Sequence, residues 1–485
     1  MGIVFKQTLR GSIWSYLGVV IGALNVAILM PRIFSEEQIG LTSILVALSA
    51  IFAQFSTFGV GGITYYFFPL FRNPEKKHHY YFAFMSLIAV AGFLVFCIVY
   101  AFFHNEILTS KSDSALLDQY SFYILPLTFF TLMFAIFDGY NTVLYDAVSG
   151  TFYKEFLFRV LNTLIIILFF YKIIDFSFFL FLYIFILSLP AILLFFRLAV
   201  RGQVSFKILE LSFFKKHRRE FFFVALFSLI SGFGSMLTIY IDKYLTNFYL
   251  GLAVTGIYTI SSYIASVLQV PARSMTKILV PLIAQNWRNN VHDKLQEIYL
   301  NSSLAQFLIS SFFFILIWIN LDIVFLILPA QYAAGKYVIL IMGLANIVNA
   351  LGGSGSTILQ ISDSYKVSTY FIFALMLLTV LLDVLLIPVW GIVGAATGAL
   401  FAAMGNVILR VIFLKRKYNL YTFDKNHLWG ILIFAGCFLV FSSFDFTGQV
   451  IINGLIKTIL ISAIYALLLL KTDLLVNREF IKRLL

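Results

Sequence analysis

Long apolar segments alternate with short polar ones along the entire chain. A helix needs about 20 apolar residues to cross roughly 30 Å of hydrocarbon, and most of the segments meet that length. The pattern therefore predicts an all-α, polytopic membrane protein with about fourteen transmembrane helices. They are expected at residues 12–30, 41–68, 80–103, 119–143, 156–171, 176–196, 221–241, 254–283, 302–328, 337–360, 367–387, 391–414, 428–446 and 450–470.

Composition supports the same class. Of the 485 residues, 61% are hydrophobic and 12% are charged, and the mean hydropathy is +0.97. A soluble domain has no use for so much apolar surface, so lipid is expected to surround most of the chain. The first apolar segment continues to about Met30 without a small-residue cleavage site, which predicts a retained first helix and not a signal peptide.

Cations are distributed unevenly between the two sides that this topology defines. With the N-terminus in the cytoplasm, twenty-five lysines and arginines fall on the cytoplasmic side and six on the outer side. Cytoplasmic loops are enriched in such residues, so the bias predicts that both termini are cytoplasmic. The net charge of +12 is mostly this asymmetry. The cations are expected to contact anionic membrane lipids, and no nucleic-acid partner is expected.

An amphipathic connection divides the predicted helices into six and eight. Residues 197–220 mix Phe, Ile and Leu with seven cations, which is typical of a segment that lies on the membrane surface. Stretches before and after it can be aligned, such as "STFGVGGITYYFFP" with "LQVPARSMTKILVP". A repeat of this kind predicts two pseudo-symmetric lobes around a central cavity. The expected parts are an N-lobe at 1–200, a C-lobe at 201–425, and two additional helices with a cytoplasmic tail at 426–485.

The sequence lacks the groups that enzymes use. The two cysteines, Cys97 and Cys437, both lie in apolar segments, so neither a disulfide framework nor a metal cluster is expected. There is no GxxxxGK[ST] loop for ATP, and no predicted span presents a Ser/His/Asp set. We therefore expect a protein that is not an enzyme and that holds no metal and no cofactor.

The eleventh predicted span and the start of the twelfth carry the most specific motif. Residues 381–400 read "LLDVLLIPVWGIVGAATGAL". This resembles the pattern N-x-x-L-I-P-x-x-G-x-x-G-A-A of oligosaccharide-lipid flippases in the multidrug, oligosaccharidyl-lipid and polysaccharide exporter superfamily, with Asp383 in place of the Asn. Three further stretches are similar to family elements in the same order along the chain: "MPRIFSEEQIGL", "DKYL" and "LPAQYAAG".

The resemblance implies a bilobed flippase of the bacterial cytoplasmic (inner) membrane that works by alternating access. Its substrate would be an undecaprenyl-pyrophosphate-linked oligosaccharide. The flippase would move it from the cytoplasmic to the outer leaflet for the biosynthesis of O-antigen (lipopolysaccharide), capsule or exopolysaccharide. Coupling to protons or sodium ions, and contact with other polysaccharide assembly proteins, would be consistent with that role.

Two cations lie one helical turn apart in the predicted span 254–283. A charge at mid-bilayer costs about 2.5–3.5 kcal/mol, so Arg273 and Lys277 need a reason to be there. They share one helix face. Either both side chains extend to the inner headgroups, or they face the cavity and bind the pyrophosphate that the resemblance implies. Arg159, at a similar depth in the other lobe, is a third candidate for pyrophosphate binding.

Further charged residues are candidates for gating or coupling. Asp138, deep in the span 119–143, either pairs with Arg159 as part of the structure or serves as the carboxylate that couples transport to an ion. Four other residues are expected near the outer ends of their spans. They would be either ordinary helix-end charges or a salt-bridged outer gate. These four are Arg32, Asp242, Lys243 and Asp383.

A drug/cation antiporter of the same superfamily is the main alternative. That class tends to need a cation-binding acid in the first lobe. The first span contains no ionisable residue, which disfavours the alternative, while Asp138 keeps it open. A membrane polysaccharide polymerase or glycosyltransferase would be expected to have a large outer loop, whereas the longest outer loop here covers about residues 105–118.

Overall fold

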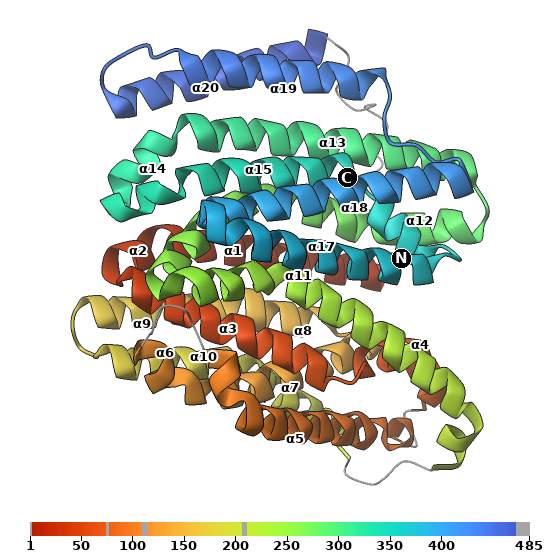
Figure 1. Cartoon of the computed structure of the whole chain (residues 1–485). Coiled ribbons are helices and arrows are strands. Elements are labelled where there is room, and N and C mark those ends of the chain that lie inside the picture. Colours follow the sequence, from red (N-terminus) through yellow and green to blue (C-terminus); the bar gives the residue numbers. More distant parts are fainter. Residues whose placement is uncertain (1, 74–76, 109–114, 206–210, 472–485) are drawn as a thin grey trace. The chain divides into compact units, whose positions relative to one another are not determined.

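All regular elements in the part of the chain that the structure describes are helices. The computed structural model describes residues 2–73, 77–108, 115–205 and 211–471 (Figure 1). Within these ranges, twelve helices are long and apolar enough to cross a membrane. The predicted all-α, polytopic membrane class is confirmed. Residues 206–210 of the expected surface connection and 472–485 of the expected tail lie outside the described residues.

The helices form two compact units, Met1–Thr259 and Ile260–Leu485. The predicted division at residues 200 and 425 stays a prediction. The first unit contains α1 (Gly2–Ala23), α2 (Met30–Ile33), α3 (Glu36–Ser56), α4 (Val60–Phe71), α5 (Tyr81–Leu108), α6 (Ala115–Tyr120), α7 (Ile124–Val143), α8 (Ala147–Thr151), α9 (Phe158–Phe170), α10 (Phe176–Val200) and most of α11 (Leu211–Ser266).

The second unit is built in the same way from long apolar helices. Within it α17 and α18 pack along each other, and α19 and α20 form a hairpin whose members both contact α13 (Figure 1). Its helices are α12 (Val270–Arg288), α13 (His292–Ile319), α14 (Leu321–Ile327), α15 (Lys336–Leu351), α16 (Gly355–Ile361), α17 (Tyr365–Trp390), α18 (Ile392–Tyr418), α19 (Lys425–Ser443) and α20 (Val450–Lys471).

Two places account for the difference between fourteen predicted spans and twelve helices of spanning length. The predicted span 156–171 falls on α9, which has 13 residues and follows the π-helical turn η4 (Phe152–Leu157). The predicted span 221–241 and the start of the span 254–283 lie in one helical run, α11, and residues 218–276 count as one helix of spanning length. In a third place the predicted span 41–68 is split into α3 and α4. The number of spanning helices is unchanged there, because α4 is too short to be counted.

The chain reverses direction inside α11. Gly251 has φ +83°, a backbone conformation that a right-handed helix cannot contain. The hydroxyl of Tyr258 donates to Oδ2 of Asp242 at 2.7 Å across 16 positions, which would be about 24 Å apart in a straight helix. The helix therefore ends at Gly251 and a second helix returns beside it. The two predicted spans therefore begin as separate helices that meet at Gly251.

Polar residues at the starts of helices hold backbone groups that the helix itself leaves unpaired. The side chain of Ser35 accepts from the amide of Gln38, and the side chain of Gln38 accepts from the amide of Ser35, so that a capping box begins α3. Asp175 accepts from the amide of Phe178 at the start of α10. These caps fix where the membrane helices begin.

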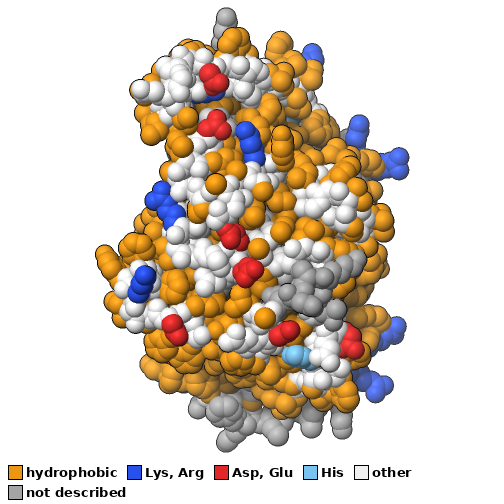
Figure 2. Space-filling view, turned by 60° about the vertical axis from the view of Figure 1, so that its left-hand side comes forward, with side chains coloured by type: hydrophobic (Ala, Val, Ile, Leu, Met, Phe, Trp, Pro, Cys, Tyr) orange, Lys and Arg blue, Asp and Glu red, His pale blue; other side chains and the backbone are white. Residues whose placement is uncertain are grey.

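The exterior of the bundle is apolar. On α5, Leu94, Ile98 and Phe102 recur at every fourth position and are 57%, 58% and 77% exposed. Figure 2 shows hydrophobic side chains over most of the visible face, with charged groups scattered among them. An exposed apolar stripe of this length indicates contact with lipid and not with water.

An ion-pair cluster ties α10 to the connection between α7 and α8. Asp146 accepts from Nε of Arg197 and from Nη1 of Arg201, both at 2.7 Å, and from the hydroxyl of Ser149 at 2.8 Å. Burial raises the pKa of Asp146, but the bonds and charges of these partners outweigh it and hold that pKa below its usual value.

Replacing Gly251 by Ala is expected to destabilise the protein, because an L-residue pays about 1–2 kcal/mol in a left-handed conformation. Gly436→Ala is the matched control. Gly436 lies in α19 with open space around the position of a Cβ, so Ala should leave stability unchanged or raise it slightly. The thermal midpoint in detergent measures both. Equal midpoints would contradict the reversal at Gly251.

Asp146→Asn is expected to lower the thermal midpoint at pH 7. The pKa of Asp146 is lower in the folded state than the ordinary Asp value of about 3.9. Its ionised carboxylate therefore stabilises the folded state fully at pH values above about 3.9. The contribution is lost as pH falls through the folded pKa. The difference from wild type should therefore become smaller as the pH is lowered below about 3.9. Asp363→Asn, on an exposed turn, is the control and should show little difference at neutral or acidic pH.

Candidate functional site

A cavity of about 500 Å³ lies within the first unit. Its wall comes from α3, α4, α7, α9, α10 and α11 together with η4. Two carboxylates, Asp138 and Glu155, and two cations, Lys154 and Arg159, line it. Charged groups at membrane depth are costly and mark functional sites, and a largely apolar cavity with a few convergent polar groups is the usual form of a binding site.

The guanidinium of Arg159 has one nitrogen that is paired and one that is not. Its Nη2 donates to Oε2 of Glu155 at 2.7 Å, one helical turn earlier. Its Nη1 is buried and has no hydrogen-bond partner among the described residues. A guanidinium is always charged and has only donors, so Nη1 lacks an acceptor. An anion that entered the cavity would supply one.

Glycines on α1 determine where that guanidinium lies. A Cβ at Gly22 would be 2.7 Å from Nη1 of Arg159, and a Cβ at Gly18, one turn earlier, would collide with the backbone carbonyl of Glu155. Small residues at this spacing let two membrane helices approach closely. The first span therefore contributes to the site because its two glycines leave the space that the guanidinium of Arg159 and the backbone of Glu155 occupy.

Both of these neighbouring segments contain a π-helical turn, η1 (Leu24–Leu29) after α1 and η4 before α9. Asn25 is buried in η1, and its Nδ2 donates to the backbone oxygen of Arg159 at 2.9 Å. The hydroxyl of Thr163 donates to Oδ1 of Asn25 at 2.8 Å. Because π turns occur frequently at functional sites, their pairing here supports the choice of this cavity.

Asp138 lies in α7 on the same cavity, and its carboxylate contacts Gly150 of α8. Lys154 is the cation whose charge acts on it, and Nζ of Lys154 lies 4.8 Å from the centre of the Phe134 ring. Asp138 and Arg159 thus share a cavity without forming an ion pair, since Arg159 pairs with Glu155. The structural pairing considered from the sequence does not form, and the coupling role of Asp138 stays a prediction.

Arg273 lies in the second unit, on an exposed part of α12. Its Nη2 donates to Oε1 of Gln269 at 2.8 Å, Nε2 of Gln269 donates to Oδ1 of Asn346 at 2.6 Å, and Nδ2 of Asn346 donates to the carbonyl of Ala265 at 2.8 Å. This chain of bonds holds the guanidinium at the start of α12. The side chain of Lys277 lies outside the described residues.

The four residues considered for an outer gate have different environments. Asp242 is buried and accepts from Tyr258 beside the α11 reversal. Lys243 follows it, with Nζ 5.8 Å from the centre of the Tyr240 ring, and Arg32 is exposed on α2. Asp383 is fully buried in α17 against Gly398 of α18. Their gating role stays a prediction.

A Ser/His/Asp arrangement, absent from the individual spans, forms between segments. Nδ1 of His427 lies 2.6 Å from Oδ1 of Asp424, and its Nε2 lies 3.1 Å from Oγ of Ser303. Ser303 is fully buried and donates its proton to the carbonyl of Leu351 at 2.6 Å. Burial raises the pKa of Asp424, but the bonds from His427 lower it overall. A buried serine whose proton is already bonded is no nucleophile. The three residues instead connect the start of α19 and the end of α15 to α13.

Sequence reasoning missed three charged residues that the structure makes prominent. Lys154 and Glu155 were not singled out, although they lie at the edge of the span 156–171, because helix-end charges usually only orient a span. Arg410 lies inside the span 391–414, and its Nε is buried without a hydrogen-bond partner in the described part of the chain. Its intramembrane position was the signal that could have identified it.

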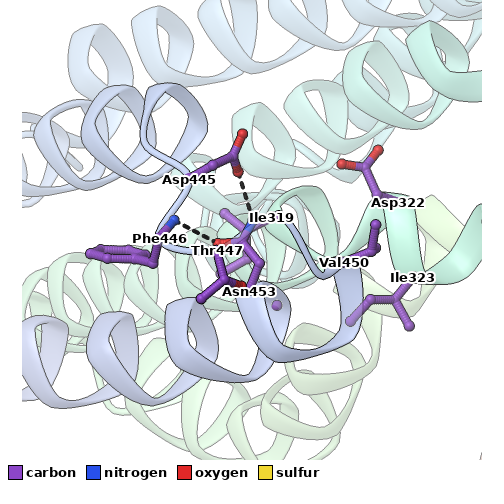
Figure 3. A pocket seen from close by; sticks show the side chains of 10 residues that line it. Ile319, Asp322, Ile323, Asp445, Phe446, Thr447, Val450 and Asn453 are labelled. Atoms are coloured by element: carbon purple, nitrogen blue, oxygen red, sulfur yellow. Dashed lines mark hydrogen bonds between the residues drawn. The ribbon is translucent and has the colours of Figure 1, made fainter.

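A second pocket, of about 400 Å³, lies in the second unit between α13–α14 and the α19–α20 connection (Figure 3). Asp445 accepts from Nζ of Lys457 at 2.8 Å and from Nδ2 of Asn453 at 2.6 Å. These bonds lower the pKa of Asp445. Asp322 lies across the pocket (Figure 3). Lys457 already neutralises Asp445, so these contacts chiefly hold the α19–α20 connection against α20. The cavity of the first unit is therefore the stronger candidate for a binding site.

No established family description matches the chain. A probable low-salt glycan biosynthesis flippase of Haloferax volcanii, Agl15, is 22% identical over 215 residues, which is 44% of this chain and 45% of that protein. The chain thus matches less than half the length of this curated relative.

Solved structures match nearly the whole chain. The lipid II flippase MurJ, in an inward closed conformation, is similar with a TM-score of 0.65 and 16% identity over 94% of this chain and 98% of its own. An inward-facing multidrug resistance transporter of the MATE family has a TM-score of 0.58 and 14% identity over 88% and 95%. A MOP superfamily transporter from Pyrococcus furiosus has a TM-score of 0.55 and 14% identity over 85% and 95%. The chain shares the fold of these transporters, two of which are described as members of the MOP superfamily, and the resemblance of residues 381–400 predicted such a fold.

The cavity is expected to contain water. In a Cys97→Ala, Cys437→Ala background, a cysteine at Thr131, which lines the cavity, should react with a membrane-impermeant thiol reagent in nanodiscs. A cysteine at Leu94, on the apolar exterior, should react at least about tenfold more slowly, because a thiol in hydrocarbon stays protonated. Mass spectrometry follows the labelling. Equal rates would show that the cavity is not hydrated.

Proposed function

We propose that this protein is a flippase for an undecaprenyl-pyrophosphate-linked oligosaccharide. It would move this lipid from the cytoplasmic to the outer leaflet of the bacterial inner membrane, for O-antigen, capsule or exopolysaccharide biosynthesis. The observation that carries the proposal is the buried Nη1 of Arg159, a donor without a partner on a permanent cation that lines a cavity. The fold shared with a lipid II flippase and the partial match to a glycan flippase support a lipid-linked cargo.

The chemistry of the cavity suits a pyrophosphate. Arg159 offers the planar donor geometry that phosphate oxygens accept, and Lys154 adds a second positive charge on the same wall. Glu155, which now bonds Nη2, would compete with the substrate for the guanidinium. Hydroxyl and amide groups from Ser49, Gln54 and other lining residues would contact a hydrated glycan. The prenyl chain, being apolar, would stay in lipid.

Other charged residues have supporting roles in this proposal. Arg273 and Lys277 bind the pyrophosphate from the C-lobe, and the bond from Arg273 to Gln269 keeps its guanidinium oriented. Asp138 couples transport to protons or sodium ions, in a cavity where Lys154 acts on its charge. The outer gate consists of Arg32, Lys243, Asp242 and Asp383.

The proposed orientation places both termini in the cytoplasm, on the basis of the twenty-five to six bias of cations. In that orientation the connection at residues 197–220 and the basic end of α18 lie at the inner surface. Other polysaccharide assembly proteins would supply the lipid-linked substrate and receive it.

A drug/cation antiporter remains the second candidate function. The cavity places two carboxylates, Asp138 and Glu155, where a cationic compound or a coupling ion could bind. The similarity to MATE transporters fits this function as well as it fits a flippase. The first span supplies no acid, so the acidic groups of this antiporter would come from α7 and η4.

Arg159→Gln is expected to slow flipping of a fluorescent pyrophosphate-linked glycolipid in proteoliposomes by about tenfold or more, because a hydrogen bond to a charged group contributes about 1.5–3 kcal/mol. The double change Arg273→Ala, Lys277→Ala should also impair flipping while the protein still inserts. A dithionite-quenching assay measures the rate.

Arg288→Gln is the matched control, because it removes an exposed arginine from the last turn of α12, and it should flip at the wild-type rate. Wild-type flipping by Arg159→Gln would refute pyrophosphate binding in this cavity. No flipping by wild type, together with proton-driven efflux of a cationic dye that Asp138→Asn abolishes, would establish the antiporter instead.

A further inference from the structure

Arg410 is a cation in the second unit without a counterion among the residues described. It lies in α18, about two turns before the helix ends at Tyr418. Its Nε is buried and has no hydrogen-bond partner in the described chain, and none of the ion pairs there includes it. A guanidinium cannot shed its charge, so only an acceptor can compensate its burial.

Tyr299 of α13 supplies a second unused donor beside it. The side chain is fully buried, and its hydroxyl has no partner in hydrogen-bonding geometry among the described residues. Thr422 is a neighbour of that hydroxyl, and its Oγ1 donates to the carbonyl of Leu351 at 3.3 Å, but the Tyr299 and Thr422 hydroxyls do not meet the geometry of a hydrogen bond to each other. The charge of Arg410 acts on the Tyr299 hydroxyl, so the two groups are close enough to serve one ligand.

Both donors lie against the turn that joins α15 to α16. A Cβ at Gly352 would be 2.6 Å from Nη2 of Arg410, and a Cβ at Gly355 would be 2.7 Å from the Tyr299 hydroxyl. The backbone of the turn is already engaged, since Gly355 donates to the carbonyl of Gly352 and Ser354 donates to Ser302. Two donors and one positive charge therefore lie against a glycine-lined turn, and neither Nε of Arg410 nor the Tyr299 hydroxyl finds a hydrogen-bond acceptor there among the described residues.

We propose that Arg410 and Tyr299 form a binding site for a phosphate oxyanion. The guanidinium would provide charge and paired donors, and the phenol a further donor at an angle to it, which suits an oxyanion with several acceptor oxygens. The ligand would be the phosphate of an anionic lipid headgroup or free inorganic phosphate. The last turn of α18 carries Lys415, Arg416 and Lys417, and basic pockets between helices near a membrane surface attract anionic headgroups.

The Arg410 site shares no residue with the proposed transport site. The cavity with Arg159 lies in the first unit, and neither Arg410 nor Tyr299 is among the residues proposed to bind the pyrophosphate. Loss of the anion site and loss of flipping can therefore be distinguished by variants in different units.

The test uses the full chain, delipidated in a neutral detergent. Wild type is titrated with phosphatidylglycerol, phosphatidylcholine or inorganic phosphate, and the thermal midpoint and native mass spectra are recorded. One of the two phosphate anions should raise the midpoint, and Arg410→Gln should weaken its binding by at least about tenfold. Tyr299→Phe should weaken it less. Arg416→Gln, which removes an exposed cation from the same helix, should bind as wild type does.

Without any anion, Arg410→Gln should be at least as stable as wild type, because it removes a partly buried charge whose Nε lacks a partner among the described residues. A response to phosphatidylglycerol alone identifies a lipid headgroup, and a response to inorganic phosphate alone identifies the free ion. If Arg410→Gln responds to both probes as wild type does, or if wild type responds to neither, the site is disproved. Should Arg410→Gln fail to fold, undiminished anion binding by Tyr299→Phe disproves it equally.

Discussion

Hydrocarbon offers no donor or acceptor to a protein, so every polar group that enters it must find a partner inside the bundle. Backbone groups meet this requirement by forming helices throughout the described chain. Polar side chains meet it through bonds between helices, as Asn25 does with the backbone of Arg159 and Ser303 with the carbonyl of Leu351. The same requirement explains why a Ser/His/Asp arrangement in this protein joins helices.

Against that background, the cations with buried donors that lack acceptors are the most informative of the unpaired groups. Arg159 in the first unit and Arg410 in the second each keep a buried nitrogen unbonded, and Tyr299 does the same with its hydroxyl. Such groups lower the stability of the free protein, and a ligand that pairs with them recovers the loss. A transporter gains from this arrangement, because binding energy is available only when an anion of suitable shape is present.

Close approach of helices is the second condition for these sites. Gly22 leaves room for the guanidinium of Arg159, and Gly352 leaves room for that of Arg410. Helices that pack through small residues gain van der Waals contact in a medium where the hydrophobic effect between them is weak. Beside Arg159, the π-helical turns η1 and η4 each shift the helical register of the segment in which they lie. Each unit thereby packs its helices closely around a guanidinium that remains partly unpaired.

The sequence by itself determined the membrane class and the approximate helix positions, because apolar length reports which solvent surrounds each segment. The fold was indicated by the resemblance of the motif in residues 381–400. The sequence also identified Arg159 and Asp138, since an ionisable residue inside an apolar run is visible in one dimension. Only the tertiary structure decided that Arg159 pairs with Glu155 and not with Asp138. It likewise brought Arg410 to Tyr299, which stands more than a hundred positions earlier. Partner choice depends on which helix faces meet, and no local pattern of hydrophobic and polar residues encodes that.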